Sequence, residues 1–349
     1  MSTASTSTVE FAVVIPAYQA AAELPGSLET VRAQRHPVRE TIVVDDGSND
    51  ATTHVALQLG ARVILTPHAG VGAARNTGIT RASAEWIAFL DADDRWSPRY
   101  LARIASAICR FPHANAVFTD YRILGNGDDY PSAHAIDRHL RAAVSQPVAP
   151  AIVRYDPGSL VPAYLRSRTF VQTSALVVRR TTLLRLGGYD EDLRVAEDFE
   201  LLLRLFADSP VLLIQEPLTT YRKHPGTLVD GLAVEGFAWE RRVWEGATTT
   251  LKRYPASLVT QLATCWPARL CEAGSCALRL GRFDHARARF TEAHRAGARA
   301  AFLGLAVATL LDNQAGRSCY GLAHACWRRR PRRWSRPARL ISNSLVSSA

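Results

Sequence analysis

Three carboxylates stand within four residues of the segment WIAFLDADDRW, at Asp91, Asp93 and Asp94. They directly follow an apolar run that is typical of a buried strand. Carboxylates at this spacing repel one another unless a positive group lies among them, because each charge disfavours ionisation of its neighbours. The cluster therefore predicts a site that binds a positive partner, whose identity depends on the residues around it.

Two more polar clusters follow apolar runs nearer the start of the chain. The segment VVIPAY ends in Ala17 and Tyr18, and the segment IVVDDGSND carries Asp45 and Asp46. In an open α/β sheet, ligands bind beyond the carboxyl ends of the strands. A lone DDG is more often a turn with capping acids. Three clusters on one rim of a sheet, however, favour a binding site.

The elements that position these clusters alternate between two kinds of segment. Short β-branched runs predict strands at residues 10–16, 40–46, 61–66 and 85–91. Between and after them, helices are expected at residues 20–34, 49–59, 71–82 and 97–110. Alternation of this kind predicts a mainly parallel, Rossmann-like sheet flanked by helices.

The next part of the chain is less regular. Residues 122–168 are rich in turn residues and proline, and a loop of this length inside a compact domain is usually functional. Around it, the pattern predicts a strand at 114–121, a strand at 170–180, a glycine turn at 186–193, a helix at 196–206 and a strand at 210–217.

From residue 228 onward the pattern becomes all-helical. Residues 278–298 resemble a helical hairpin of the tetratricopeptide type, but one such unit is too few for a stable array. We therefore expect an α/β domain over residues 1–227, with a helical C-terminal region over 228–349 packing against it.

Composition bounds the class of protein. The chain has 349 residues, 47% of them apolar, which is ordinary for a soluble globular protein. No stretch approaches the roughly 18 apolar residues of a spanning helix, and the first residues lack a basic signal region, so a cytoplasmic protein is expected.

The net charge of +10 is concentrated near the C-terminus. Residues 326–340, CWRRRPRRWSRPARL, hold seven arginines and two tryptophans and no acid. This predicts docking on an anionic surface, with the inner face of the cytoplasmic membrane preferred. Nucleic acid is not expected, because no recognition module accompanies the charge. A solvated tail is the open alternative.

Six segments, taken together and in this order, resemble the family 2 glycosyltransferases of the GT-A fold: VVIPAYQA, IVVDDGSND, GVGAARNTGI, FLDADD, GGYDEDLRVAEDFELLLRL and YRKH. The resemblance covers roughly residues 9–227. It implies an enzyme that transfers a sugar from a nucleotide sugar to an acceptor, with inversion, and with Mg²⁺ or Mn²⁺.

For the metal, the resemblance implies Asp93 as a direct ligand and His224 of YRKH as a second one. Asp91 would lie toward the ribose or reach the metal through water, and Asp94 would support the loop. The cation would neutralise charge on the departing diphosphate, and it would be the positive partner of the aspartate cluster.

For the donor nucleotide, the resemblance implies contacts from residues of the first three motifs: Pro16, Ala17, Tyr18, Asp45, Asp46, Arg75 and Asn76. Asp46 is favoured over Asp45 as acceptor of the N3–H of uracil or thymine. The segment GVGAAR is no dinucleotide fingerprint, because arginine stands where the third glycine belongs.

For the chemical step, the resemblance makes Asp198 the general base that takes the proton of the acceptor hydroxyl, with Glu197 orienting the base or the acceptor. The alternative is that both acids only complement the N-terminus of a helix.

The expected function is transfer from a nucleotide-diphosphate sugar, preferably a UDP-sugar, to a hydroxyl of a glycan or lipid-linked acceptor in cell-surface polysaccharide synthesis. Two alternatives stay open. One is a non-catalytic sugar-nucleotide or glycan-binding module of the same fold. The other is a phosphatase with an aspartyl nucleophile, which also places DxD after an apolar strand but expects different residues after the motif.

Overall fold

The computed structural model describes residues 9–125, 128–167, 170–194, 196–223 and 282–298, together with single helical positions between 267 and 308. The chain divides into two compact units. The first holds Met1–Asp230 with Thr250–Leu258, and the second holds Gly231–Thr249 with Val259–Ala349. The sequence predicted a division after residue 227.

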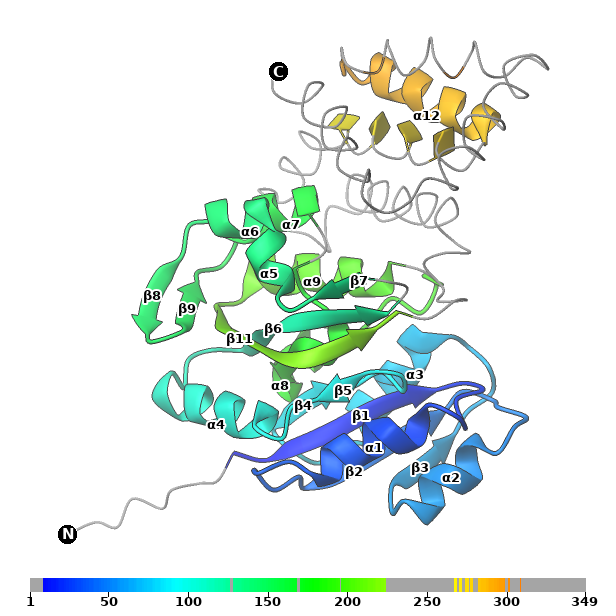
Figure 1. Ribbon diagram of the computed structural model, residues 1–349, viewed down its shortest axis with the longest axis vertical. Coiled ribbons are helices and arrows are strands. Elements are labelled where there is room, and N and C mark those ends of the chain that lie inside the picture. Colours follow the sequence, from blue (N-terminus) through cyan, green and yellow to red (C-terminus); the bar gives the residue numbers. More distant parts are fainter. Residues whose placement is uncertain are drawn as a thin grey trace. The chain divides into compact units, whose positions relative to one another are not determined.

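The first half of the sheet is parallel and has the order β3–β2–β1–β4 (Figure 1). Its strands are β1 (Phe11–Ala17), β2 (Glu40–Asp45), β3 (Arg62–Leu65) and β4 (Trp86–Phe89). The helices that follow them are α1 (Leu24–Arg32), α2 (Thr52–Gln58), α3 (Val71–Arg81) and α4 (Tyr100–Arg110). The predicted α/β sheet flanked by helices is confirmed.

Strand β1 is buried along its whole length because helices cover both of its faces. Phe11, Val13 and Ile15 share one hydrophobic cluster with apolar residues of α1 and α4. Val14 points to the opposite face, where it meets Gly78 of α3 so closely that a Cβ at Gly78 would overlap it. Because successive side chains of β1 point to opposite faces of the sheet, this strand packs against helices on both faces.

The second half of the sheet is mixed. Strand β10 (Leu176–Arg179) runs antiparallel between β4 and β6 (Ala116–Gly125), and β6 pairs in parallel with β11 (Val211–Arg222). The antiparallel hairpin of β8 (Gln146–Ala149) and β9 (Ile152–Tyr155) completes that edge. Two short strands, β5 (Arg95–Trp96) and β7 (Asp128–Tyr130), pair with β11 and β6.

Residues 122–168, expected to be irregular, contain short elements. Besides β7, β8 and β9, they form α5 (Ala133–Ile136), α6 (Arg138–Ala142) and α7 (Val161–Ser167). The expectation was wrong because each element is only three to seven residues long, too short for periodicity to emerge from turn-rich sequence.

The segment 170–180, expected to be one strand, is interrupted. Residues Thr173–Ala175 form a 3₁₀ turn, and only Leu176–Arg179 belongs to the sheet. Helix α8 (Arg180–Leu186) follows directly, and α9 (Glu197–Asp208) begins after the glycine turn. The 3₁₀ turn places Ser174 within hydrogen-bonding distance of the aspartate cluster.

In the second unit, the helical prediction is confirmed for α12 (Phe283–Arg295) and for helical positions between residues 267 and 278. A Cβ at Gly274 would lie 2.8 Å from the Phe290 ring, so these helical residues pack closely on α12. No helix within the described residues is long and apolar enough to cross a bilayer. The arginine-rich segment 326–340 lies outside the described residues.

Candidate active site

The aspartate cluster forms the turn that follows β4. Asp94 is fully buried there, and its carboxylate accepts hydrogen bonds from Ser174 Oγ (2.6 Å) and from the backbone N–H of Arg222 (3.1 Å). Ser174 Oγ also accepts from the backbone N–H of Asp91 (3.0 Å). Asp94 thus fastens the turn to the 3₁₀ turn and to β11, and Asp91 and Asp93 stand half-buried beside it.

The electrostatics of the turn show how much negative charge it concentrates. The pKa of Asp94 lies well above its usual range, first because of burial and then because of the charges of Asp91 and Asp93. A divalent cation among these oxygen ligands would relieve that repulsion. Asp91 and Asp93 therefore supply the type of oxygen ligand that Mg²⁺ or Mn²⁺ prefers.

The protein supplies one positive partner itself. Arg75, on α3, is 4% exposed, and its two amino groups bind Asp91 Oδ1 and Glu197 Oε1, each at 2.8 Å. Its guanidinium carbon lies 5.3 Å from the centroid of the Tyr189 ring. One buried arginine therefore ties the aspartate turn to the start of α9, although Asp91 and Glu197 are more than a hundred residues apart.

Asn76, the neighbour of Arg75, holds the glycine turn. Its side-chain oxygen accepts from the backbone N–H of Tyr189 (2.8 Å), and its amide nitrogen donates to the carbonyl of Tyr189 (2.9 Å) and to Glu191 Oε1 (2.8 Å). Both ends of the side-chain amide are thus engaged with the turn. That Arg75 and Asn76 also contact a nucleotide stays a prediction.

Helix α9 presents the two acids expected to act in the chemical step. Ala196, just before the helix, has a left-handed backbone (φ +65°), a strained conformation for alanine that is typical of functional sites. Glu197 is buried against Arg75, whereas Asp198 is half-buried and accepts from the backbone N–H of Phe199 at 2.7 Å. Of the two, Asp198 is the carboxylate that solvent reaches.

Glu197 titrates near neutral pH. The pKa of its carboxyl is raised to about 7, mainly by burial and in addition by the charge of Asp198, while Arg75 opposes both. A carboxyl tuned to this range is typical of sites that move protons. Its neighbour Tyr189 is buried as well, and burial raises the pKa of that hydroxyl.

Asp45 and Asp46, on the side of the rim where the sequence predicts the nucleotide (hereafter the nucleotide side), are both buried. Asp45 accepts one hydrogen bond on each oxygen, from the backbone N–H of Ser48 (2.8 Å) and from Thr53 Oγ1. Asp46 accepts from the backbone N–H of Ala69 (2.9 Å) and of Gly70 (2.8 Å). The two acids that were expected to bind the base also organise the loops around them.

Asp46 has additional partners that the sequence did not reveal. Thr66 Oγ1 lies 3.4 Å from its Oδ1, and His68 Nδ1 lies 3.1 Å from its Oδ2. The ring of His68 contacts that of Tyr18 in a tilted arrangement, with centroids 4.2 Å apart and an angle of 31° between the ring planes. Tyr18 is 50% exposed, so the pair offers an aromatic surface next to buried Pro16 and Ala17.

The expected second metal ligand, His224, lies outside the described residues. Within the part of the chain that the structure describes, no three His, Cys, Asp or Glu side chains gather into a group that would hold a metal. The metal site therefore stays a prediction carried by Asp91 and Asp93. Sequence patterns also missed Ser174, because it stands inside a run that resembles a strand.

Comparisons with known proteins define the class first. The chain aligns with the S. aureus TarS 1–349 structure in complex with UDP-GlcNAc at a TM-score of 0.54, with 17% identity, over 82% of this chain and 89% of that one. It aligns with the mannosyltransferase PcManGT from Pyrobaculum calidifontis, solved with GDP-Man and Mn²⁺, at a TM-score of 0.51, with 20% identity, over 90% and 86%. The fold is that of GT-A transferases.

The sequence comparisons then give the family. Residues 12–172 match the model of glycosyl transferase family 2. An uncharacterized glycosyltransferase of Haemophilus influenzae is 24% identical over 59% of this chain, and the amylovoran biosynthesis glycosyltransferase AmsB of Erwinia amylovora is 27% identical over 61%. The chain spans 66% of the first and 69% of the second. Residues 12–172 thus match the family 2 glycosyltransferases, a family of transferase enzymes, and both relatives carry glycosyltransferase names.

Proposed function

We propose that the chain is an inverting, metal-dependent glycosyltransferase that moves a sugar from a nucleoside diphosphate sugar to an acceptor hydroxyl. The observation that carries this proposal is the bridge through Arg75, which joins Asp91 of the aspartate turn to Glu197 at the start of α9. A donor held at the turn would therefore have the acids of α9 within the same site.

Each residue then has a task. Asp93, with Asp91, would hold Mg²⁺ or Mn²⁺, which stabilises negative charge on the diphosphate as the sugar departs. Asp198, the more exposed acid, takes the proton of the acceptor hydroxyl. Glu197, fixed by Arg75, orients this base. With Asp198 as the one base, the acceptor hydroxyl displaces the diphosphate in a single step, and a single displacement inverts the configuration of the anomeric carbon.

For the donor, we propose a UDP-sugar. The TarS structure binds UDP-GlcNAc and the PcManGT structure binds GDP-Man, so the fold itself accepts more than one base. The exposed ring of Tyr18 supplies a stacking surface that suits any base. Asp45, the last residue of β2, and Asp46, which follows it, would add the hydrogen bonds that discriminate between bases.

For the acceptor, we propose a glycan or a lipid-linked glycan in cell-surface polysaccharide synthesis, and the relative AmsB, named as an amylovoran biosynthesis glycosyltransferase, supports a biosynthetic role. The arginine-rich segment 326–340 would dock a cytoplasmic enzyme on the anionic inner membrane face, at about 1 kcal/mol for each arginine near the surface.

The decisive experiment screens nucleotide sugars for metal-dependent turnover. We expect hydrolysis or transfer of a UDP-sugar with Mn²⁺ or Mg²⁺ and none in excess chelator. Calorimetry with the same donors runs beside it, because binding without turnover would instead indicate a non-catalytic module.

Membrane docking is tested by sedimentation with anionic vesicles. The full chain should pellet with them in a salt-dependent way, and a chain ending at Ala325 should stay in solution. Equal pelleting of the two, or no effect of salt, would leave the docking idea without support.

A further inference from the structure

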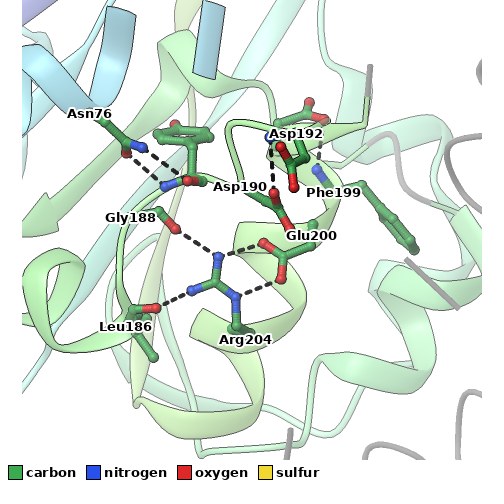
Figure 2. A network of polar contacts seen from close by, with 10 residues as sticks. Asn76, Leu186, Gly188, Asp190, Asp192, Phe199, Glu200 and Arg204 are labelled. Carbon is green, nitrogen blue, oxygen red and sulfur yellow. Dashed lines mark hydrogen bonds and ion pairs between the residues drawn. The ribbon is translucent and has the colours of Figure 1, made fainter. Parts of the chain in front are cut away.

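The middle of α9 holds a buried ion pair in which an arginine also binds backbone carbonyls. Arg204 is 3% exposed, and it donates from Nε to Glu200 Oε1 (2.8 Å) and from Nη2 to Glu200 Oε2 (2.5 Å). The same guanidinium donates to the carbonyl of Leu186 and to that of Gly188 (2.7 Å). Figure 2 shows all four contacts converging on one side chain.

The carbonyls that Arg204 binds belong to the turn between α8 and α9. Leu186 is the last residue of α8, and Gly188 has a left-handed backbone (φ +67°). A Cβ at Gly188 would overlap Oδ1 of Asn76, which itself binds the Tyr189 backbone from the other side (Figure 2). Side chains of two helices, α3 and α9, therefore hold this turn between them.

This arrangement joins the two ends of the segment that leads to the expected base. The segment starts at Leu186 and ends where α9 begins, one residue before Asp198. Arg204 fixes its start to α9, and Arg75 fixes Glu197 at its end to the aspartate turn. Both contacts therefore lie on the segment that leads to Asp198.

A buried ion pair is a costly way to fill a core, since two apolar side chains of similar volume usually stabilise a fold equally well or better. An apolar pair, however, would leave the carbonyls of Leu186 and Gly188 without this donor. The guanidinium, with donors in a fixed fork, is the side chain that binds a carboxylate and two carbonyls at once.

We propose that Arg204 is a positioning residue of the transferase: by fixing the Leu186–Gly188 turn to α9 it sets where Asp198 meets the acceptor hydroxyl. Arg204 itself touches neither donor nor acceptor. The proposal rests on the role of Asp198 as base in the proposed function, and it adds a residue pair, Glu200 and Arg204, to which that function assigns no part.

The test needs a variant that loses the positioning but keeps the fold. Arg204→Met alone leaves Glu200 buried without its cation, so a loss of activity would be ambiguous. The double variant Arg204→Met with Glu200→Met replaces both charges by apolar side chains of similar length. It removes the donors to the turn without leaving an unpaired charge.

A matched control is available in a second arginine that joins the same two helices, α8 and α9. Arg185 of α8 binds Asp208 of α9 with two hydrogen bonds (2.7 and 2.5 Å), and its side chain is 52% exposed. Arg185→Met thus also removes an arginine that ties α8 to α9, but one that does not bind the turn carbonyls. Arg204→Lys keeps the charge and is the conservative rescue.

Four quantities are measured on the full-length chain: the melting temperature, the dissociation constant for UDP with Mn²⁺, kcat for transfer, and hydrogen–deuterium exchange of residues 186–194. For the double variant we expect a melting temperature and a UDP affinity near those of the wild type. We expect kcat about 10²-fold lower, because displacement of a reacting group by about 1 Å has an effect of this size. Exchange should increase in the turn and not in β1.

The comparison of variants decides the outcome. Arg204→Lys should recover part of kcat, and Arg185→Met should keep kcat and the exchange of the turn unchanged. A double variant with wild-type kcat overturns the proposal, as does one whose turn exchanges no faster than that of Arg185→Met. If the wild type turns over no nucleotide sugar, the proposed function fails, and the exchange data alone decide whether Arg204 positions the turn.

Discussion

In the first half of the sheet, Asp46 is held by the backbone N–H groups of Ala69 and Gly70, whereas in the second half Glu197 is held by a buried arginine. The first arrangement uses neutral donors from a loop about twenty residues away. The second uses a charge that joins residues more than a hundred positions apart. The nucleotide side can therefore form locally, but the α9 side forms only when the whole domain has folded.

The difference has a physical reason. Backbone donors of a loop between a strand and a helix are present wherever the fold is an open α/β sheet. The α9 side is built on a mixed part of the sheet, where β10 is antiparallel to its neighbours and α9 follows a glycine turn. Its acids thus depend on side chains such as Arg75 and Arg204 for their orientation.

The largest effect is expected at the aspartate turn, which both halves share. Asp93→Ala should lower turnover by about 10³-fold, because the cation that stabilises the leaving diphosphate loses a ligand. Metal titration of transfer checks this, with thermal melting as the control for folding. Wild-type turnover of the variant, or full activity of the wild type in excess chelator, would contradict a metal role.

The next largest effect is expected at the start of α9. Asp198→Asn keeps the shape of the side chain and removes its basicity, so turnover should fall by about 10²-fold while the donor still binds. Single-turnover kinetics beside calorimetry separate the two. Unchanged turnover would reduce Asp198 to an acid that complements a helix N-terminus.

Variants of Arg75 test the link between the aspartate turn and the start of α9. Arg75→Met leaves Asp91 and Glu197 without their shared cation, and removal of one partner from a buried ion pair costs about 3–5 kcal/mol of unfolding free energy. Arg75→Lys should lose less stability because it keeps the positive charge, but it should stay below the wild type because a single ammonium cannot replace two bonds from a planar fork. Urea unfolding measures both. Equal stability of the Met variant and the wild type would show that the two halves are held independently of Arg75.

Because Glu197 titrates, both stability and activity should depend on pH. Its pKa is raised by burial from the ordinary 4.5 to about 7, so its protonated form favours folding below pH 4.5, and this contribution is lost as the pH rises through about 7. Activity should follow the opposite course, because only ionised Glu197 pairs fully with Arg75.

Unfolding free energies and kcat/KM between pH 5 and pH 8 test these two trends. In Glu197→Gln, both pH dependences should become flatter than in the wild type. If the variant keeps the pH profile of the wild type, another group is responsible for it.

The same comparison explains how far the sequence could predict the site. The clusters ending at Asp46 and Asp91 follow apolar runs, and this pattern alone was enough to predict that they lie on one rim of the sheet. In the structure they lie at the ends of β2 and β4. Ser174 and Arg204 carry no such signal, because their partners lie on other elements. A cation inside the apolar run LLLRLF does indicate a buried pair, but it does not name the carbonyls that the cation binds.

The smallest effects are expected at the nucleotide side, where they can decide which acid binds the base. A carboxylate has about four acceptor positions. Among the described residues, the carboxylate of Asp46 accepts three hydrogen bonds, from Thr66, Ala69 and Gly70, and lies 3.1 Å from His68 Nδ1, a nitrogen that also contacts the backbone carbonyl of Asp46 (3.0 Å). The carboxylate of Asp45 accepts two. Asp45 therefore retains the larger capacity for a new donor such as a base N–H.

Conservative variants of the two acids separate these roles. Asp45→Asn should weaken binding of UDP by about tenfold, as expected for loss of a hydrogen bond to a charged group, with little change in stability. Asp46→Asn turns an amide toward backbone donors, so it should lower the free energy of unfolding by about 1–3 kcal/mol. Calorimetry with UDP and Mn²⁺ and urea unfolding measure the two effects. The reverse pattern, with affinity lost at Asp46 and stability at Asp45, would return the base contact to Asp46, as the sequence favoured, and would mean that its loop contacts rearrange when the nucleotide binds.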